Sequence, residues 1–254
     1  MESKQQTRAQ KDLEEKLALE EPFSRELAAL FALIVKEFST YVAKNGISPG
    51  SEKYMTEFMQ VLRKHYARVQ KRFKGTVAEM NEINLDQDLS EDIDYNLLTW
   101  SDATAPVQAT YITATNSSNM QESINMAERI ISENGDIITN RTLAATAPIF
   151  LRRLFKGRIS GISVYETQNT AEATKNIEAN AISRDFIRKQ KKQWRTVGDI
   201  FVRETHNRAN GQRVDIDKPF IVGEARLKYP GDTSLGAPIK EVAHCRCSSV
   251  YELR

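Results

Sequence analysis

The residues whose types and spacing could do chemistry lie in the last third of the chain. Cys245 and Cys247 are the two cysteines of the 254-residue sequence, and one residue separates them. Alternate side chains of an extended segment share a face, so both thiols are expected to point the same way. His206, in the stretch V-R-E-T-H, is the imidazole that could join them. Two thiolates and an imidazole suit Zn(II), so these three residues form a candidate metal site.

Several other roles for these residues stay open. Structural zinc takes four ligands and is usually held by wider cysteine spacings, and only Asp232 or His244 could supply the fourth ligand here. A disulfide is disfavoured, because alternate residues of a strand lie about 6.6 Å apart, near the limit of disulfide geometry. The alternative is that Cys245 and Cys247 are small buried hydrophobic side chains and that His206 anchors a turn by hydrogen bonds.

Patterns typical of enzymes are absent from the sequence. A cysteine nucleophile with His206 as its base needs a third orienting group and a pocket, and no local residue pattern supplies them. There is no Walker loop, G-x-S-x-G elbow, H-E-x-x-H helix or Gly-rich dinucleotide turn. We therefore expect a protein that is not an enzyme and has no cofactor other than the possible zinc. Glu166 with Arg203, in the manner of an ADP-ribosyltransferase, is the enzyme alternative.

Short strands and tight turns must position the candidate ligands. Residues 200–202 and 220–222 are rich in β-formers. Asn-Gly at 210–211 and Tyr-Pro-Gly-Asp at 229–232 are turn sequences, because Asn and Gly tolerate positive φ and Pro presets φ. The stretch 194–247 is therefore predicted to be a compact β-rich module. The main apolar side chains of its core are expected to be Trp194, Phe220 and Tyr229.

The N-terminal part of the chain is helical by its hydrophobic periodicity. Apolar residues recur at helical spacing over 27–42 and over 54–73, and the short link between these segments predicts an antiparallel hairpin. The fold class expected is α+β, with an N-terminal α-helical region followed by a small β-rich C-terminal module. Further helices are expected at about 85–100, 118–134, 139–157 and 162–184.

The net charge of +2 conceals a segregation of charge along the chain. The net charge is +4 over residues 1–75, −11 over 76–136 and +9 over 137–254. The acidic order D-Q-D-L-S-E-D-I-D lacks the central Gly and distal Glu of a calcium-binding EF-hand loop. Leucines and isoleucines interleave with these carboxylates, so we expect an amphipathic helix that docks on a partner or on the helical hairpin.

The densest basic run in the chain surrounds a tryptophan. With Trp194 as a stacking aromatic, its cations are a candidate nucleic-acid site that would contact phosphates. The alternative is an exposed helix end beside a core tryptophan. The basic residues of this run are Arg188, Lys189, Lys191, Lys192 and Arg195.

The bulk properties exclude two classes of protein. No apolar run approaches the roughly 20 residues that a membrane-spanning helix needs, so no membrane span is expected. The charged N-terminus is unlike a secretory signal, and a single C-x-C pair is no disulfide framework. A protein made in a reducing cytoplasm fits these properties.

The order of motifs in the last third resembles a known family. Trp194, V-R-E-T-H, N-G-Q, K-P-F, Y-P-G-D and a closing C-R-C are similar to the Mu F-like phage head morphogenesis (minor head protein) domain. Upstream, Glu166-Thr167 followed by Asn176 resembles the R-T-E-T…N helix of that family. The chain departs from the pattern at Tyr165, where the usual Arg-Thr before the glutamate is missing, and at His244, where the family usually has Asn.

The resemblance implies a domain organisation and a function. The parts would be a polar lead-in (1–21), a helical adaptor region with the acidic segment (22–136) and a Mu F-like head morphogenesis domain (137–254). The protein would be a minor capsid protein of a tailed phage that binds the portal vertex and acts in head morphogenesis, DNA packaging or genome ejection.

The resemblance also implies partners and a location. The expected partners are the phage portal protein, then scaffold or major capsid protein, with double-stranded DNA near the basic end. The expected location is inside the capsid of the virion, and the bacterial host cytoplasm during assembly. The alternatives from other classes are an ADP-ribosyltransferase-like enzyme and a zinc-stabilised nucleic-acid-binding module.

Overall fold

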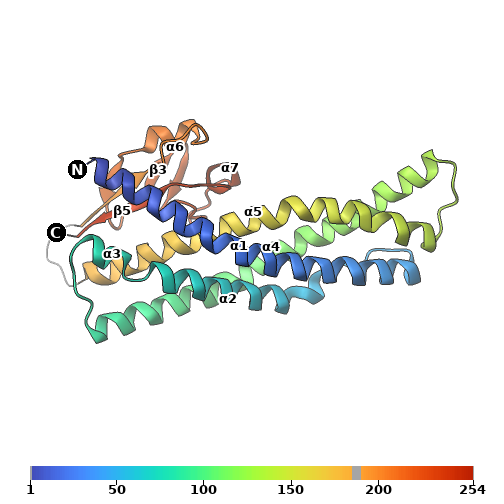
Figure 1. Ribbon diagram of the computed structural model, residues 1–254, viewed down its shortest axis with the longest axis horizontal. Helices are drawn as coiled ribbons and strands as arrows, with labels where there is room; N and C mark the ends of the chain where they lie inside the picture. The colour runs from blue at the N-terminus through green and yellow to red at the C-terminus, as the bar shows by residue number, and fades with distance from the viewer. Residues whose placement is uncertain (1, 185–189, 254) are drawn as a thin grey trace. The chain divides into compact units, whose positions relative to one another are not determined.

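The computed structural model describes residues 2–184 and 190–253, with side chains from Arg8 onward. It confirms the α+β class, because long helices precede a small set of antiparallel strands (Figure 1). Among the described helices, none has the length and apolarity that crossing a membrane requires.

The helices before the strands are α1 (Glu2–Asn45), η1 (Glu52–Tyr54), α2 (Met55–Phe73), α3 (Thr76–Met80), α4 (Gln87–Glu133) and α5 (Asn140–Ser183). The elements that follow are β1 (Lys191–Arg195), α6 (Glu204–Ala209), β2 (Arg213–Asp215), β3 (Phe220–Val222), β4 (Ala225–Leu227), α7 (Ile239–Val242) and β5 (Ser248–Glu252).

The helices are longer than the sequence predicts. The helices expected at 85–100 and 118–134 are parts of one helix, α4, and those expected at 139–157 and 162–184 are parts of α5. Helix α1 begins well before Pro22, and this proline lies inside the helix. Gly157 lies at the predicted end of the 139–157 helix, but an interior glycine costs only about 1 kcal/mol relative to alanine. Tertiary packing of the flanking turns outweighs a penalty of that size.

The chain forms two compact units, and each is discontinuous in sequence. The first unit comprises Met1–Glu21, His65–Ser101 and Ser163–Arg254, and the second comprises Pro22–Lys64 and Asp102–Ile162. The division into 1–21, 22–136 and 137–254 rests on the family resemblance and stays a prediction.

The second unit is built from helices around an aromatic core. Phe31 of α1 packs edge-on against Phe58 of α2 and Phe155 of α5, with ring centroids 5.6 and 4.5 Å apart. All three rings are buried. Edge-to-face aromatic packing of this kind adds to the free energy of burying the rings, so these three phenylalanines fix the helices of this unit on one another.

The first unit contains the strands. β1 lies between β2 and β5, antiparallel to both, and Trp194 of β1 faces Ser249 of β5 in the register. β3 and β4 form a separate hairpin in which Phe220 pairs with Leu227. In Figure 1, β5 lies beside α3, which agrees with their close backbone approach.

Two local predictions for the strand region were wrong. Residues 191–195 form strand β1 and not a helix end, because pairing with β2 and β5 supplies their backbone hydrogen bonds. The stretch 200–202 is a turn and not a strand, and the Ile200 side chain is 92% exposed. The V-R-E-T-H motif then enters the short helix α6.

The turn predictions are confirmed. Gly211 has φ +84° at the Asn-Gly turn, which here links α6 to β2. Asp232 N–H donates to the Tyr229 carbonyl at 3.1 Å, and Gly231 has φ +94° as the turn requires. The predicted core side chains Trp194, Phe220 and Tyr229 are all buried.

Candidate metal centre

Helix α6 fixes the orientation of the His206 ring. The buried imidazole has Nε2 3.0 Å from the backbone carbonyl oxygen of Glu241, which follows Ile239 and Lys240 in α7. A carbonyl only accepts, so Nε2 carries the proton and donates, and Nδ1 presents its lone pair. In metal centres the second ring nitrogen of a ligating histidine almost always makes such a hydrogen bond.

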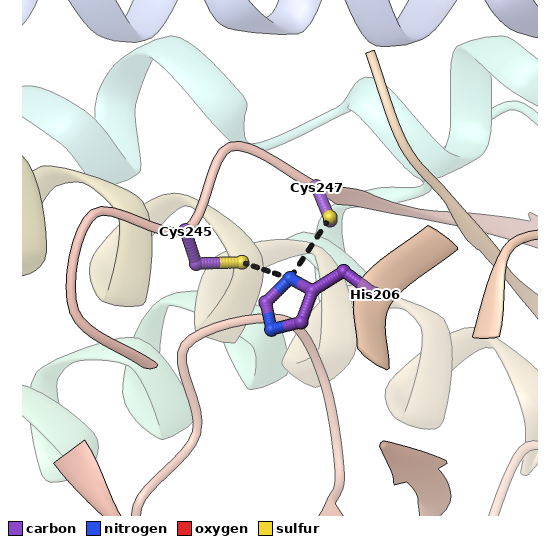
Figure 2. Close-up of side chains that lie close together, drawn as sticks. All are labelled: His206, Cys245 and Cys247. Carbon is purple, nitrogen blue, oxygen red and sulfur yellow. Dashed lines mark hydrogen bonds between the residues drawn. The ribbon is translucent and has the colours of Figure 1, made fainter. Parts of the chain in front are cut away.

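Both cysteine sulfurs converge on that lone pair. Figure 2 shows both sulfurs pointing at His206 Nδ1. Cys245 Sγ lies 3.8 Å and Cys247 Sγ 3.4 Å from this nitrogen. The three donor atoms all lie within 4.8 Å of one another, and all three side chains are buried. The prediction that the thiols share a face is confirmed. Arg246 between them turns away and its guanidinium lies 2.7 Å from the Asp199 carboxylate.

Backbone contacts hold the C-x-C segment in place on both sides. His244 adopts φ +52° just before it, and Cys245 N–H donates to the Val242 carbonyl at 3.2 Å. After it, the Cys247 carbonyl accepts a 2.8 Å hydrogen bond from the Gln168 side-chain amide on α5. These contacts hold the backbone of the C-x-C segment on both sides.

The two thiols differ in acidity. The hydrogen bond from Cys247 holds the pKa of Cys245 well below its usual value despite burial. Burial raises the pKa of Cys247, and the neighbouring Cys245 sulfur raises it further. Of the two thiols, Cys245 is therefore the more acidic. A thiolate is the form of cysteine that binds metals.

The predicted fourth ligands do not join the cluster. Among the described His, Cys, Asp and Glu side chains, only His206, Cys245 and Cys247 gather as possible metal ligands. His244 is exposed. The Asp232 carboxylate accepts from the backbone N–H groups of Lys228 and Ser234, both at 2.8 Å, and so stabilises its own turn.

A cavity and an aromatic wall border the cluster. Cys245 lines a cavity of about 320 Å³, together with His244, Arg246 and Gln168. The Trp194 ring packs edge-on against the His206 ring at 5.4 Å, and Trp194 packs against Phe220 in the same buried core. The imidazole therefore has an apolar wall, while Cys245 borders a cavity.

The residues of the enzyme alternative are not paired. Glu166 is fully buried, accepts a 2.7 Å hydrogen bond from Tyr66 Oη, and has its pKa raised to about 8 by burial. The Arg203 guanidinium donates to the Ala243 carbonyl. Within the described residues, no ion pair joins Glu166 to Arg203.

The basic run around Trp194 is only partly available to a nucleic acid. Arg188 and Lys189 lie outside the described residues. Lys191 pairs with Asp215 at 2.5 Å, and Arg195 is half-buried. Lys192 is 1% exposed and its ammonium donates to the Lys228 carbonyl at 2.7 Å.

Including Lys192 in a phosphate-contacting surface was therefore wrong. Alternation along β1 turns Lys192 and Trp194 inward together. Burial lowers the pKa of Lys192 to about 8. Its ammonium also lies 5.3 Å from the Phe220 ring centroid, so this cation interacts with groups inside the protein.

The sequence did not predict a buried network of ion pairs that involves α1 and α5. Glu172 and Lys175 of α5 pair at 2.6 Å; Lys16 of α1 reaches Glu172 at 2.8 Å, and Asp12 reaches Lys175 at 2.7 Å. Glu172 also accepts from the Ser249 backbone N–H at 2.8 Å. The i, i+3 spacing of Glu172 and Lys175 was a visible signal, but their partners are far away in sequence.

No family model, curated protein or solved structure matches this chain. The resemblance to the Mu F-like domain therefore rests on the order of motifs in the sequence, and the function that it implies is a proposal.

Proposed function

We propose that this chain is a minor head protein of a tailed phage, of the Mu F-like kind, and that it works without catalytic turnover. The observation that supports the proposal is the contact between the two stretches that resemble the family. The Glu-Thr…Asn helix lies within α5, and the closing C-R-C precedes β5. Gln168 of α5 donates to the Cys247 carbonyl, and Asn176 lies 3.4 Å from Tyr251 Oη. Stretches separated by 75 to 79 residues thus form one packed unit.

The burial of the motif residues favours a structural role. Side chains that serve a chemical step must reach a substrate, whereas those of a rigid recognition module pack against one another. The motif side chains Trp194, His206, Phe220, Tyr229, Cys245 and Cys247 are all buried. Glu166 and Arg203 make separate hydrogen bonds, which counts against the ADP-ribosyltransferase alternative.

The second unit is the adaptor that we propose for the portal protein. Exposed apolar side chains mark surfaces for protein contacts when they gather on one element. Val107 and Tyr111 lie four residues apart on α4 and are 50% and 66% exposed. Ile137 and Ile138, between α4 and α5, are also exposed. Scaffold and major capsid protein are the other head proteins that such a surface could contact.

The proposal places the protein inside the capsid, after assembly in the bacterial host cytoplasm. The net charge of +9 over residues 137–254 is compatible with packaged double-stranded DNA nearby. With Lys192 buried, such contact would depend on the remaining cations of the basic run.

Co-purification with the portal protein of the same phage tests this function. We expect the wild-type chain to be retained by tagged portal, and Val107→Glu with Tyr111→Glu to reduce retention at least tenfold. Leu235→Glu is the matched control, because Leu235 is equally an exposed apolar residue but belongs to the first unit. Failure of the wild-type chain to bind portal, and its absence from purified virions, would remove the proposal.

A further inference from the structure

We propose that His206, Cys245 and Cys247 bind one zinc ion, with a water molecule or small anion as the fourth ligand. The inference is independent of the phage proposal, because it depends only on the donor atoms and their surroundings. It would assign the C-x-C pair a chemical role that the packing alternative lacks.

The nitrogen–sulfur spacing of the donors matches zinc. In a tetrahedral site with Zn–N of about 2.0 Å and Zn–S of about 2.3 Å, nitrogen and sulfur lie about 3.5 Å apart. Here the Nδ1–Sγ distances are 3.4 Å to Cys247 and 3.8 Å to Cys245. The distances lie on either side of the expected value. A metal ion could therefore be bound while the backbone stays in place.

The direction in which the three donor atoms point favours a metal ion. His206 Nε2 lies 3.0 Å from the Glu241 carbonyl oxygen, which leaves Nδ1 as the ring nitrogen that faces the sulfurs. Both Cys245 and Cys247 point at this nitrogen. A cation between the three atoms would engage the lone pair and both sulfurs together.

Charge and burial agree with the same assignment. Two thiolates and Zn²⁺ have no net charge, so the loaded site could lie against Trp194 and Phe220 without burying an unbalanced charge. Thiolates without a cation would be costly in these surroundings.

The fourth ligand would come from solvent. His206, Cys245 and Cys247 are the only candidate protein ligands gathered here among the described residues. The 320 Å³ cavity lined by Cys245 offers a route for the ion and room for a water molecule. Three protein ligands with an open fourth position are a known zinc arrangement.

A bound ion would join distant parts of the first unit. His206 belongs to α6, and the two cysteines lead directly into β5. Coordination would tie these elements through one centre, next to the hydrogen bond from Gln168 to the Cys247 carbonyl. The consequence is a C-terminal strand that is held by metal as well as by sheet pairing.

The test is metal analysis of full-length protein purified under reducing conditions. We expect about one zinc per chain, and we expect Co²⁺ exchanged into the site to give thiolate-to-metal charge-transfer bands and the intense visible bands of four-coordinate cobalt. Native mass spectrometry should show the zinc adduct with two protons lost. A folded wild-type protein that binds neither Zn²⁺ nor Co²⁺, or one in which the cysteines form a disulfide in the same buffer, overturns the proposal.

Variants separate the ligands from their neighbours. Cys245→Ser and Cys247→Ser should each weaken Co²⁺ binding at least tenfold. Glu224→Ala is the control, because Glu224 is an exposed carboxylate of the same unit that belongs neither to the cluster nor to the cavity lining, so the variant should bind Co²⁺ as the wild type does. Loss of binding in Glu224→Ala with retention in Cys247→Ser would also overturn the assignment. If a serine variant fails to fold, the cobalt spectrum of the wild-type protein decides.

Discussion

The Gln168 side-chain amide donates a 2.8 Å hydrogen bond to the backbone carbonyl of Cys247, and the same amide lies 3.3 Å from the Pro230 carbonyl. Gln168 is buried on α5, so helix, turn and C-terminal segment meet at one side chain. The geometry of the candidate metal centre therefore depends on a residue that is not itself a ligand.

Replacing Gln168 by Leu should destabilise the protein by about 1–3 kcal/mol, because two buried carbonyls would lose their donor. Urea unfolding followed by circular dichroism measures this change in the free energy of unfolding. Gln87→Leu is the control: Gln87 is exposed on α4, and its replacement should change stability by no more than about 0.5 kcal/mol. Equal effects of the two variants would contradict the role of Gln168.

Replacing Glu172 by Gln should cost about 3–5 kcal/mol, because Lys16 and Lys175 would remain buried with less negative charge to pair with. Glu204→Gln is the matched control, since the Glu204–Arg208 pair is exposed on α6 and such pairs contribute roughly 0–1 kcal/mol. Chemical denaturation of both variants at one pH gives the comparison. A loss below about 1 kcal/mol for Glu172→Gln would show that the network tolerates an unpaired cation.

Stability should depend on pH through Glu166. Its folded-state pKa of about 8 lies above the ordinary glutamate pKa of 4.5, so the folded protein holds a proton that the unfolded chain releases. The contribution of Glu166 to stability is therefore fully present below about pH 4.5 and is lost as pH rises to about 8.

Between pH 5.5 and 7.5 the wild-type protein should lose roughly 2 kcal/mol of stability relative to Glu166→Gln, which has no such proton. Paired denaturation curves at the two pH values check this. All other titrating groups are common to both proteins and cancel in the comparison. Parallel losses in the two proteins would mean that Glu166 is ionised in the folded state.

If residues near Trp194 contact double-stranded DNA, Lys191 and Lys192 should behave differently. Lys191→Met should lower the slope of log affinity against log salt by about 1, because an outward cation would be lost. Lys192→Met should leave the slope unchanged, because its ammonium is bound inside the protein to the Lys228 carbonyl. Fluorescence anisotropy with a duplex over a salt series measures both. A flat salt response of the wild-type chain would reject phosphate contact altogether.

Zinc should stabilise the wild-type protein and not the double variant Cys245→Ser with Cys247→Ser. At free Zn²⁺ 100 times the dissociation constant, linkage predicts a gain of about 2.7 kcal/mol. A chelator should reverse the gain, and affinity should fall at lower pH because the thiols must lose their protons. Thermal unfolding with and without metal tests this. Equal stabilisation of both proteins would place the binding elsewhere.

Local features of the sequence determined much of the fold. The segment 54–73 was predicted as a helix and is α2 with a shift of one residue at its start, because its apolar spacing is unambiguous. The strand at 220–222 and both turns were also correct, since Pro, Gly and Asn restrict the backbone locally. Helix ends were less predictable, because isolated glycines and prolines inside α1, α4 and α5 are outweighed by packing.

The alternation of side chains along an extended segment was enough to place Cys245 and Cys247 on one face. That His206 meets them, and that Asp232 and His244 do not, was decided by the tertiary structure. The sheet pairing of β1 likewise turned Lys192 inward. The ion pair between Glu172 and Lys16 forms only because α5 packs against α1. Backbone preferences act over a few residues and are written in the local sequence. Contacts between residues far apart in the chain depend on how the elements pack, which no short stretch of sequence specifies.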